Sequence, residues 1–159
     1  MANKQVQELV KQFETMFQGS PWYGSSIEEI LEEIDEKVAF WTPTPKAHSI
    51  AQLVWHMVYW CQSLIKRLEG DLTYKGSMKS EDNWSTESKL KALGWSTILK
   101  LLHESQNRLL ELLTKQPDSL LDKIYIEKAT HRDLIQGILQ HDLYHAGQIA
   151  YLKSICTLK

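Results

Sequence analysis

The 159-residue sequence predicts an all-α protein, a four-helix bundle with one short additional helix and long crossover connections.

 Three observations predict this fold. Apolar residues recur at helical spacing through four long segments, capping residues open these segments, and glycine or proline follows them. No stretch alternates strongly enough between apolar and polar residues to indicate a sheet. At this length we expect one domain spanning residues 1–159.

The first half of the fold is predicted to begin with two helices separated by a break at residues 19–21. Residues 3–17 carry an apolar stripe and form the first long helix. A shorter helix starts after Ser25 or Ser26, with acidic residues in its first turn, where the helix dipole favours them. Residues 41–45 contain two prolines and form an extended linker, because a residue before proline avoids the helical conformation.

The second long helix is predicted over residues 50–68. Ser49 and Gln52 have the spacing of a capping box at its start, and Gly70 closes it. The polar connection that follows, residues 71–85, is long enough to cross from one end of a bundle to the other. Long connections of this kind allow helices that are not consecutive to become neighbours.

The third long helix is predicted over residues 86–116, where Pro117 stops it. Residues 118–129 form a connector, and Thr130 opens the last helix.

Composition and charge exclude several classes of function. The net charge is −2, from 18 basic and 20 acidic residues that are mixed along the chain, so no basic stripe for nucleic acid is present. No apolar run approaches the roughly 20 residues that cross a bilayer, and the first residues lack the apolar core of a signal peptide. Cys61 and Cys156 are far apart and form no CxxC pair. We therefore expect a cytoplasmic protein with no membrane partner.

The last helix carries the most informative pattern, His141 and His145, four residues apart on one face. Both replace apolar residues on the seam that a bundle helix turns toward its partners. Burying two polar rings costs about 1–3 kcal/mol each unless both find partners. Two interpretations stay open from the pair alone: core histidines with satisfied hydrogen bonds, or two ligands of one divalent metal ion.

The pair differs from the His-Glu-x-x-His helix of zinc proteases. Asp142 follows the first histidine, and no His, Asp or Glu lies downstream of residue 145, so a third ligand must come from upstream. Among the upstream histidines, His56 is the one within a helix that is apolar over most of its circumference. His48 is predicted to lie just outside a helix, and His103 on a polar stripe. His131 is predicted to begin the last helix, about 15 Å from His141.

A set of His56, His141 and His145 would hold a divalent ion with three neutral nitrogen ligands. Such a site leaves the ion's charge intact and positions open for water or substrate. Zinc or nickel are the metals we expect first, and iron, manganese or copper also accept such ligands. Asp142 and Gln148 are predicted to orient the imidazoles through hydrogen bonds, although a salt bridge is an equal interpretation for Asp142.

Aromatic residues near these histidines are candidates for a pocket wall. Trp55 and Trp60 bracket His56 in the sequence, and Tyr144 precedes His145. Trp60 and Tyr144 are therefore candidate substrate contacts, while core packing is the alternative for aromatic residues at helical spacing.

The segment Gly-Ile-Leu-Gln-His-Asp-Leu-Tyr-His-Ala-Gly-Gln-Ile at residues 137–149 resembles the DinB superfamily of small bacterial metalloproteins. The helix start at Ser49 that leads to His56, and Trp95 in the third helix, add to the resemblance. It implies a four-helix bundle in which His56, His141 and His145 hold one divalent metal. It also implies thiol-dependent transferase or isomerase relatives that use bacillithiol, mycothiol or glutathione, and a homodimer. One departure is His131, where relatives more often carry an aromatic residue.

We therefore expect a metal-dependent transferase that joins a low-molecular-weight thiol to a small electrophile. A metal-dependent hydrolase that uses activated water is the first alternative. A non-enzymatic metal-binding module is the second.

Overall fold

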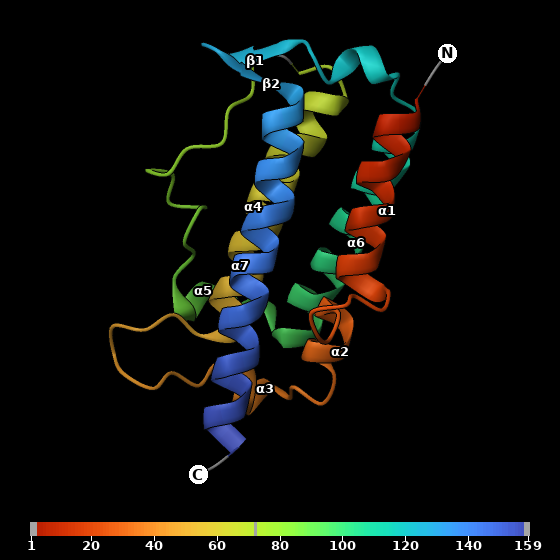
Figure 1. Cartoon of the computed structure of the whole chain (residues 1–159). Coiled ribbons are helices and arrows are strands. Elements are labelled where there is room, and N and C mark those ends of the chain that lie inside the picture. The colour runs from red at the N-terminus through yellow and green to blue at the C-terminus, as the bar shows by residue number, and fades with distance from the viewer. Residues whose placement is uncertain (1–2, 72, 158–159) are drawn as a thin grey trace.

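The computed structural model describes residues 3–71 and 73–157 and confirms the all-α fold (Figure 1). Its elements, in chain order, are α1 (Lys4–Gln18), α2 (Ile27–Leu31), α3 (Glu36–Ala39), α4 (Ile50–Leu68), α5 (Glu87–Leu93), α6 (Trp95–Thr114), the short 3₁₀ helix η1 (Asp118–Leu120), β1 (Ile124–Ile126), β2 (Ala129–Thr130) and α7 (His131–Thr157). The helices α1, α4, α6 and α7 form the bundle. None of the described helices has the length and apolar character needed to cross a membrane.

The four long helices pack in the cyclic order α1, α6, α4 and α7, so that α1 and α4 lie on a diagonal. In Figure 1, α1 and α7 run downward, whereas α4 and α6 run upward. The chain between α4 and α5 returns along the length of the bundle, as the sequence predicts for residues 71–85. The crossover connection lies against α4, where residues 82 and 83 contact Trp55 and His56.

Capping side chains explain where several helices begin. Ser49 Oγ accepts a hydrogen bond from the Gln52 amide at 3.2 Å, and Gln52 Oε1 accepts one from the Ser49 amide at 3.1 Å. Ser26 and Glu29 form the same reciprocal pair at the start of α2. Each pair satisfies two backbone N–H groups that no helical carbonyl reaches. The predicted starts of α2 and α4 are therefore confirmed.

The prediction of one continuous third helix over residues 86–116 is wrong. The helix is divided at Gly94, whose φ of 81° lies in the left-handed region that glycine adopts without steric cost. The break places the buried Trp95 ring against the rest of the bundle, where its Nε1 donates a hydrogen bond to the Ile34 carbonyl at 2.7 Å. Tertiary packing thus overrides the helical pattern.

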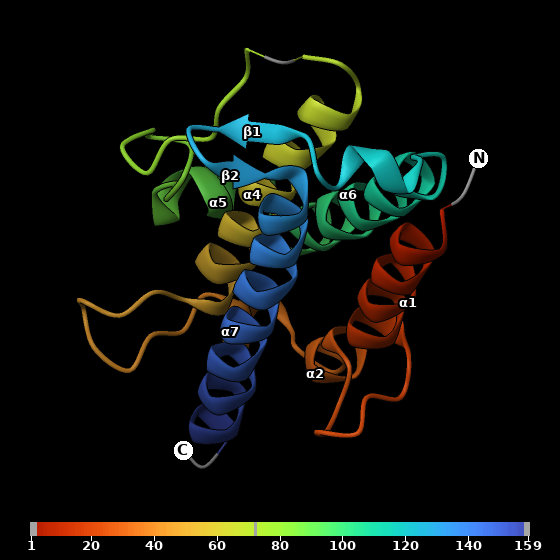
Figure 2. The ribbon, with the colours of Figure 1, turned by 45° about the horizontal axis from the view of Figure 1, so that its top comes forward.

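The expectation that the chain has no sheet is also wrong in a small region. Figure 2 shows β1 and β2 as a hairpin above the start of α7. The strands are antiparallel, with Ile124 opposite Thr130 and Ile126 opposite Ala129. They contain 3 and 2 residues, too few for apolar and polar residues to alternate visibly. Helix α3 was not predicted either; the Asp35 side chain caps it by accepting from the Val38 amide at 2.8 Å.

The core fills the space between the four long helices. Its largest fully buried side chains include Phe13 from α1, Met57 and Leu64 from α4, Leu109 from α6 and Ile135 from α7. Several buried polar side chains interrupt this apolar interior, and four of them lie where α4, α6 and α7 meet: His56, Gln106, Asp142 and His145. That region contains the histidines singled out in the sequence.

Candidate metal centre

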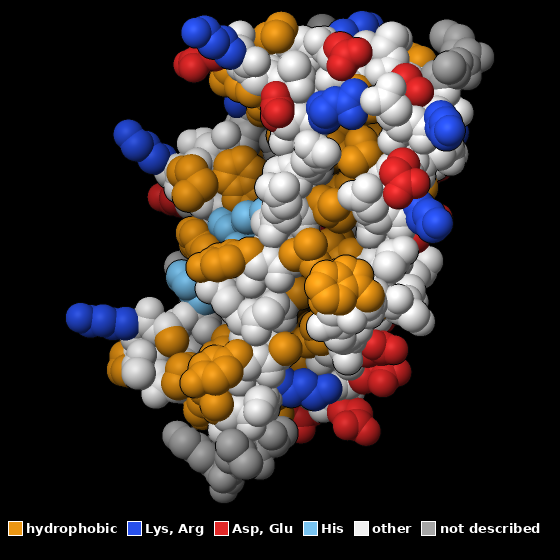
Figure 3. All heavy atoms as spheres, viewed as in Figure 1, with side chains coloured by type: hydrophobic (Ala, Val, Ile, Leu, Met, Phe, Trp, Pro, Cys, Tyr) orange, Lys and Arg blue, Asp and Glu red, His pale blue; other side chains and the backbone are white. Residues whose placement is uncertain are grey.

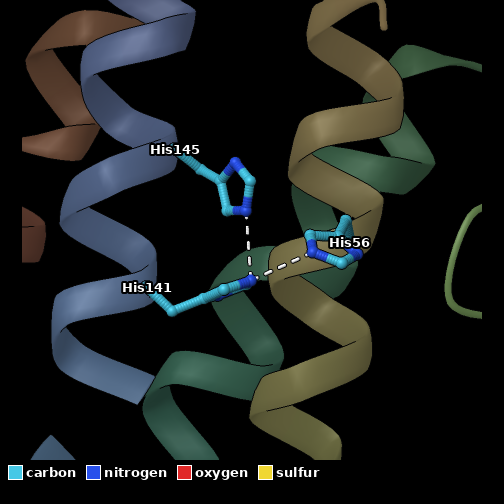
Figure 4. A group of neighbouring side chains, drawn as sticks. All are labelled: His56, His141 and His145. Carbon is cyan, nitrogen blue, oxygen red and sulfur yellow. Dashed lines mark hydrogen bonds between the residues drawn. The ribbon is translucent and has the colours of Figure 1, made fainter. Parts of the chain in front are cut away.

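Three histidine rings meet between α4 and α7 (Figure 4). His56 extends from α4, and His141 and His145 extend from successive turns of α7. The Nε2 atom of His141 lies 3.0 Å from Nε2 of His56 and 3.1 Å from Nε2 of His145. One nitrogen from each ring lies within 4.8 Å of the other two. The geometry required for a shared ion, three rings from two helices within a few ångströms, is therefore present.

Each ring also has an oxygen behind it, on the side away from the other rings. The Asn83 carbonyl lies 3.0 Å from Nδ1 of His56, and Gln148 Oε1 lies 2.6 Å from Nδ1 of His145. Asp142 Oδ1 lies 3.5 Å from Nδ1 of His141. Because the oxygens behind His56 and His145 accept hydrogen bonds, Nδ1 is the nitrogen that carries the proton in these two rings. In His141, the charge of the nearby Asp142 carboxylate favours the proton on Nδ1.

This assignment leaves a lone pair on each Nε2, and the three lone pairs point toward one another. Without a cation between them, such an arrangement is repulsive. A tetrahedral zinc ion with bonds of about 2.1 Å would separate its nitrogen ligands by about 3.4 Å, close to the two short separations here. The three histidines therefore fit a divalent metal ion.

Asp142 is fully buried behind His141. Its Oδ2 atom accepts a hydrogen bond from Gln106 Nε2 of α6 at 3.1 Å. Its Oδ1 atom and Nδ1 of His141, 3.5 Å apart, form no hydrogen bond with each other or with another described residue. Burial raises the pKa of the Asp142 carboxyl, opposed by the neighbouring His141 ring and by the hydrogen bond from Gln106. The carboxylate thus depends on these two side chains for compensation.

Burial also favours the neutral form of the imidazoles that a metal requires. It lowers the pKa of His56 to about 4, and the neighbouring histidines add to this effect while the Asn83 carbonyl opposes it. Burial lowers the pKa of His145 too, opposed by the hydrogen bond with Gln148. At neutral pH these rings therefore offer unprotonated nitrogens without first losing a proton.

Aromatic rings fix the position of His56. Trp84 stacks on the His56 ring, with centroids 3.8 Å apart and planes inclined by 9°. On its other face, Trp84 stacks on the exposed ring of His48, again at 3.8 Å. Trp60 meets both His56 and His141 edge to face, at 6.4 and 6.3 Å. The ring of His56 is thus held by packing as well as by its hydrogen bond.

A pocket of about 470 Å³ opens onto the three rings. Trp60 and Tyr144, the candidate substrate contacts, both line it, together with Met78 from the crossover loop. Trp55 does not line this pocket; its Nε1 donates to the Asp82 carbonyl at 2.8 Å and ties the loop to α4. In Figure 3, histidine atoms are visible beside α7 between hydrophobic side chains.

The histidines that the sequence analysis set aside have other partners. His103 pairs with Glu28 at 3.4 Å on the surface between α6 and α2. His131 is buried at the start of α7, where its Nδ1 donates to the Lys123 carbonyl at 2.8 Å. Neither residue is part of the three-histidine cluster.

Three residues that support the site were not identified from the sequence: Asn83, Trp84 and Gln106. Gln106 had a recognisable signal, because it interrupts the apolar stripe of Leu102, Leu109 and Leu113 on α6. Trp84 is the tryptophan of a mainly polar loop, which is also a signal. Asn83 acts through its backbone carbonyl, which every residue possesses, so no sequence pattern could reveal it.

Comparison with known protein families is consistent with this geometry. The model of the DinB superfamily matches residues 24–149, well over half of the chain. The chain belongs to the DinB superfamily. No curated protein sequence matches this DinB protein. The matched region contains α2 to most of α7, and with it all three histidines of the cluster. Membership and geometry together support a metal centre in this DinB protein, at a site built from its own α4 and α7.

Proposed function

We propose that this DinB protein is a metal-dependent transferase that joins a low-molecular-weight thiol to a small electrophile. The observation that carries the proposal is the convergence of three Nε2 atoms, each with an oxygen behind its Nδ1. The cluster contains three neutral imidazoles and no anionic ligand among the described residues. Such a ligand set suits a reactive ion better than a structural one, because structural zinc sites are usually closed by four protein ligands.

A bound divalent ion would supply the acidity that converts a thiol, or in the alternative water, into a nucleophile at neutral pH. The chain's own residues position this chemistry. Asp142, Gln148 and the Asn83 carbonyl hold the protons on the outer nitrogens and so fix the direction of each ring. Trp60 and Trp84 limit access of water to His56 from two sides.

The sulfur must arrive with a cosubstrate. Cys61 is fully buried, its thiol donates to the Ser105 carbonyl at 3.6 Å, and burial raises its pKa. A buried thiol that stays protonated is not a nucleophile. Cys156, near the end of α7, does not line the pocket above the histidines. A soluble thiol such as bacillithiol therefore supplies the nucleophile in this proposal.

The test is turnover of the metal-loaded protein with chlorodinitrobenzene, with and without bacillithiol, cysteine or glutathione. In the proposed reaction the thiol loses its proton, a sulfur–carbon bond forms, and the carbon–chlorine bond breaks to release chloride. We expect turnover only with a thiol, and its loss in His145→Ala. Turnover without thiol would favour the hydrolase instead. No turnover, combined with lower stability in the metal-free protein, would favour a metal-stabilised binding module.

We also propose a homodimer, in line with the family resemblance. The supporting observation is Trp22, 96% exposed at the end of a groove between α1 and α7 that Met16, Leu139 and Leu143 line. Aromatic residues are enriched at protein interfaces, and an exposed apolar patch around a groove, unlike a single exposed residue, marks an interaction site. Sedimentation equilibrium should give twice the chain mass for the wild type and a weaker dimer for Trp22→Ser. A monomeric wild type would reject this proposal.

A further inference from the structure

The pocket above the histidines has mainly apolar walls. Trp60 of α4, Met78 of the crossover loop, and Leu134, Ile138 and Tyr144 of α7 line it. None of the described residues that line it is a lysine or arginine. Met78 is 71% exposed and Tyr144 is 65% exposed, so apolar surface extends to the mouth of the pocket. Such walls bind apolar groups and contain no cationic side chain that would pair with an anionic one.

Asp133 is the one acidic residue among the described residues that line this pocket. Its Oδ2 atom accepts hydrogen bonds from the Thr130 amide and the Thr130 hydroxyl, both at 2.7 Å. These hydrogen bonds, the one from the amide first, lower the pKa of Asp133, so the side chain is charged at neutral pH. A fixed negative charge at the pocket disfavours anions further.

Gly137 gives the pocket its width. Glycine in the middle of a helix is less stable than alanine, so its presence in α7 needs a reason. Its φ is not in the left-handed region, and no described heavy atom other than its chain neighbours and the backbone of its own helix lies within 4 Å of an added Cβ. Neither backbone geometry nor packing therefore requires glycine here. Gly137 lines the pocket one turn before His141, so any side chain at this position would occupy the pocket.

We propose that the pocket held open by Gly137 binds an uncharged, apolar electrophile, such as an aromatic or aliphatic molecule, and that its walls and Asp133 disfavour an anionic group placed away from the bound ion. The inference rests on the proposed function, because it names the substrate class of the same site. The charged part of the thiol cosubstrate would stay outside the apolar walls. A volume of about 470 Å³ is within the usual range for small-molecule sites.

The test measures binding without turnover, using two probes of similar shape, naphthalenemethanol and naphthoate. The full-length protein is first freed of metal with a chelator, so that the histidines hold no cation that could bind the carboxylate. Binding is followed by the methionine methyl signals in NMR spectra. Met78 lines the pocket above the histidines, whereas Met16 lines the separate groove between α1 and α7. We expect naphthalenemethanol to shift the Met78 signal and leave the Met16 signal unchanged.

Matched variants test the role of Gly137. Gly147 lies in the same helix, also has no described atom within 4 Å of an added Cβ, and lines the groove on the side of α2. Gly137→Leu should lower the affinity for naphthalenemethanol by about tenfold or more, whereas Gly147→Leu should leave this affinity unchanged. Asp133→Asn, which keeps an acceptor for Thr130, should raise the affinity for naphthoate by about threefold. The affinity for naphthalenemethanol should not change.

Three results would overturn the inference: equal affinity for the uncharged probe in Gly137→Leu and the wild type, a shift confined to Met16, or unchanged naphthoate binding in Asp133→Asn. Because the probes need no thiol, these results are separate from the test of the proposed transferase. Thiol-dependent turnover without probe binding would reject the substrate class alone. Probe binding with turnover that needs no thiol would reject the transferase alone.

Discussion

Replacing Asp142 with asparagine should change metal affinity and stability in opposite directions. The Asp142 carboxylate lies 3.5 Å from Nδ1 of His141 and is fully buried. Loss of a carboxylate behind a metal-binding histidine typically lowers metal affinity 10- to 100-fold. This change corresponds to about 1.4–2.8 kcal/mol. We therefore expect zinc to bind Asp142→Asn about 10- to 100-fold more weakly.

The metal-free protein should respond differently. Without a metal ion, the buried carboxylate costs free energy that its hydrogen bonds offset only in part, as its raised pKa indicates. Asparagine has nearly the same shape without the charge, and its amide could donate to Gln106 Oε1, which has no partner among the described atoms. We expect the free energy of unfolding of the metal-free variant to rise by about 1 kcal/mol.

Two assays check this prediction: competition with a chromophoric chelator for zinc affinity, and urea unfolding of the chelator-treated protein for stability. Asp122→Asn is the control, because the Asp122 side chain is 79% exposed and should change neither quantity. Unchanged zinc affinity in Asp142→Asn would show that the carboxylate does not orient His141. A less stable metal-free variant would show that the carboxylate serves the fold instead of the metal.

Three further predictions concern the same framework. Burial lowers the pKa of His56 from about 6.5 to about 4, so the metal-free protein should be most stable above pH 6.5 and lose stability as the pH falls toward 4. Urea unfolding across this range measures the free energy of unfolding, and a value that does not change with pH would contradict the prediction. An added Cβ at Gly76 would lie 2.6 Å from the Trp60 ring, so Gly76→Ala should lower the free energy of unfolding by about 1–3 kcal/mol and displace the crossover loop. Urea unfolding measures the stability, and a change in the tryptophan fluorescence of the folded protein reports the displacement. Trp95→Phe removes the donor to the Ile34 carbonyl and should cost about 1–3 kcal/mol; an unchanged melting temperature would show that this hydrogen bond is dispensable.

The sequence was sufficient for the main features of the fold. The starts of α2 and α4 follow from local hydrogen bonds between residues three apart, which the sequence displays directly. The break at Gly94 does not follow, because a single glycine is tolerated within a helix and only the burial of Trp95 against Ile34 makes the break favourable. The hairpin of β1 and β2 was missed because its strands are too short to show a period.

The candidate site also contains residues that the sequence identified and residues that it did not. His141 and His145 share a helix, so their spacing alone places both rings on one face. His56 lies in another helix, and its selection depended on the apolar surroundings that a buried position requires. The contacts of His56 with the crossover loop, through Asn83 and Trp84, depend on a loop path that no local pattern specifies. Residues that act through long-range geometry are the ones that sequence reasoning does not reach.

The most direct measurement of the central claim is the metal content of the chain and of its histidine variants. The protein is loaded with zinc, dialysed, and analysed by elemental mass spectrometry, alongside His56→Ala, His141→Ala and His145→Ala. We expect one equivalent per chain in the wild type and loss of the ion in each variant, because two remaining imidazoles hold it weakly. A wild type that retains no metal, or a His56→Ala variant that retains a full equivalent, would contradict a site shared between α4 and α7.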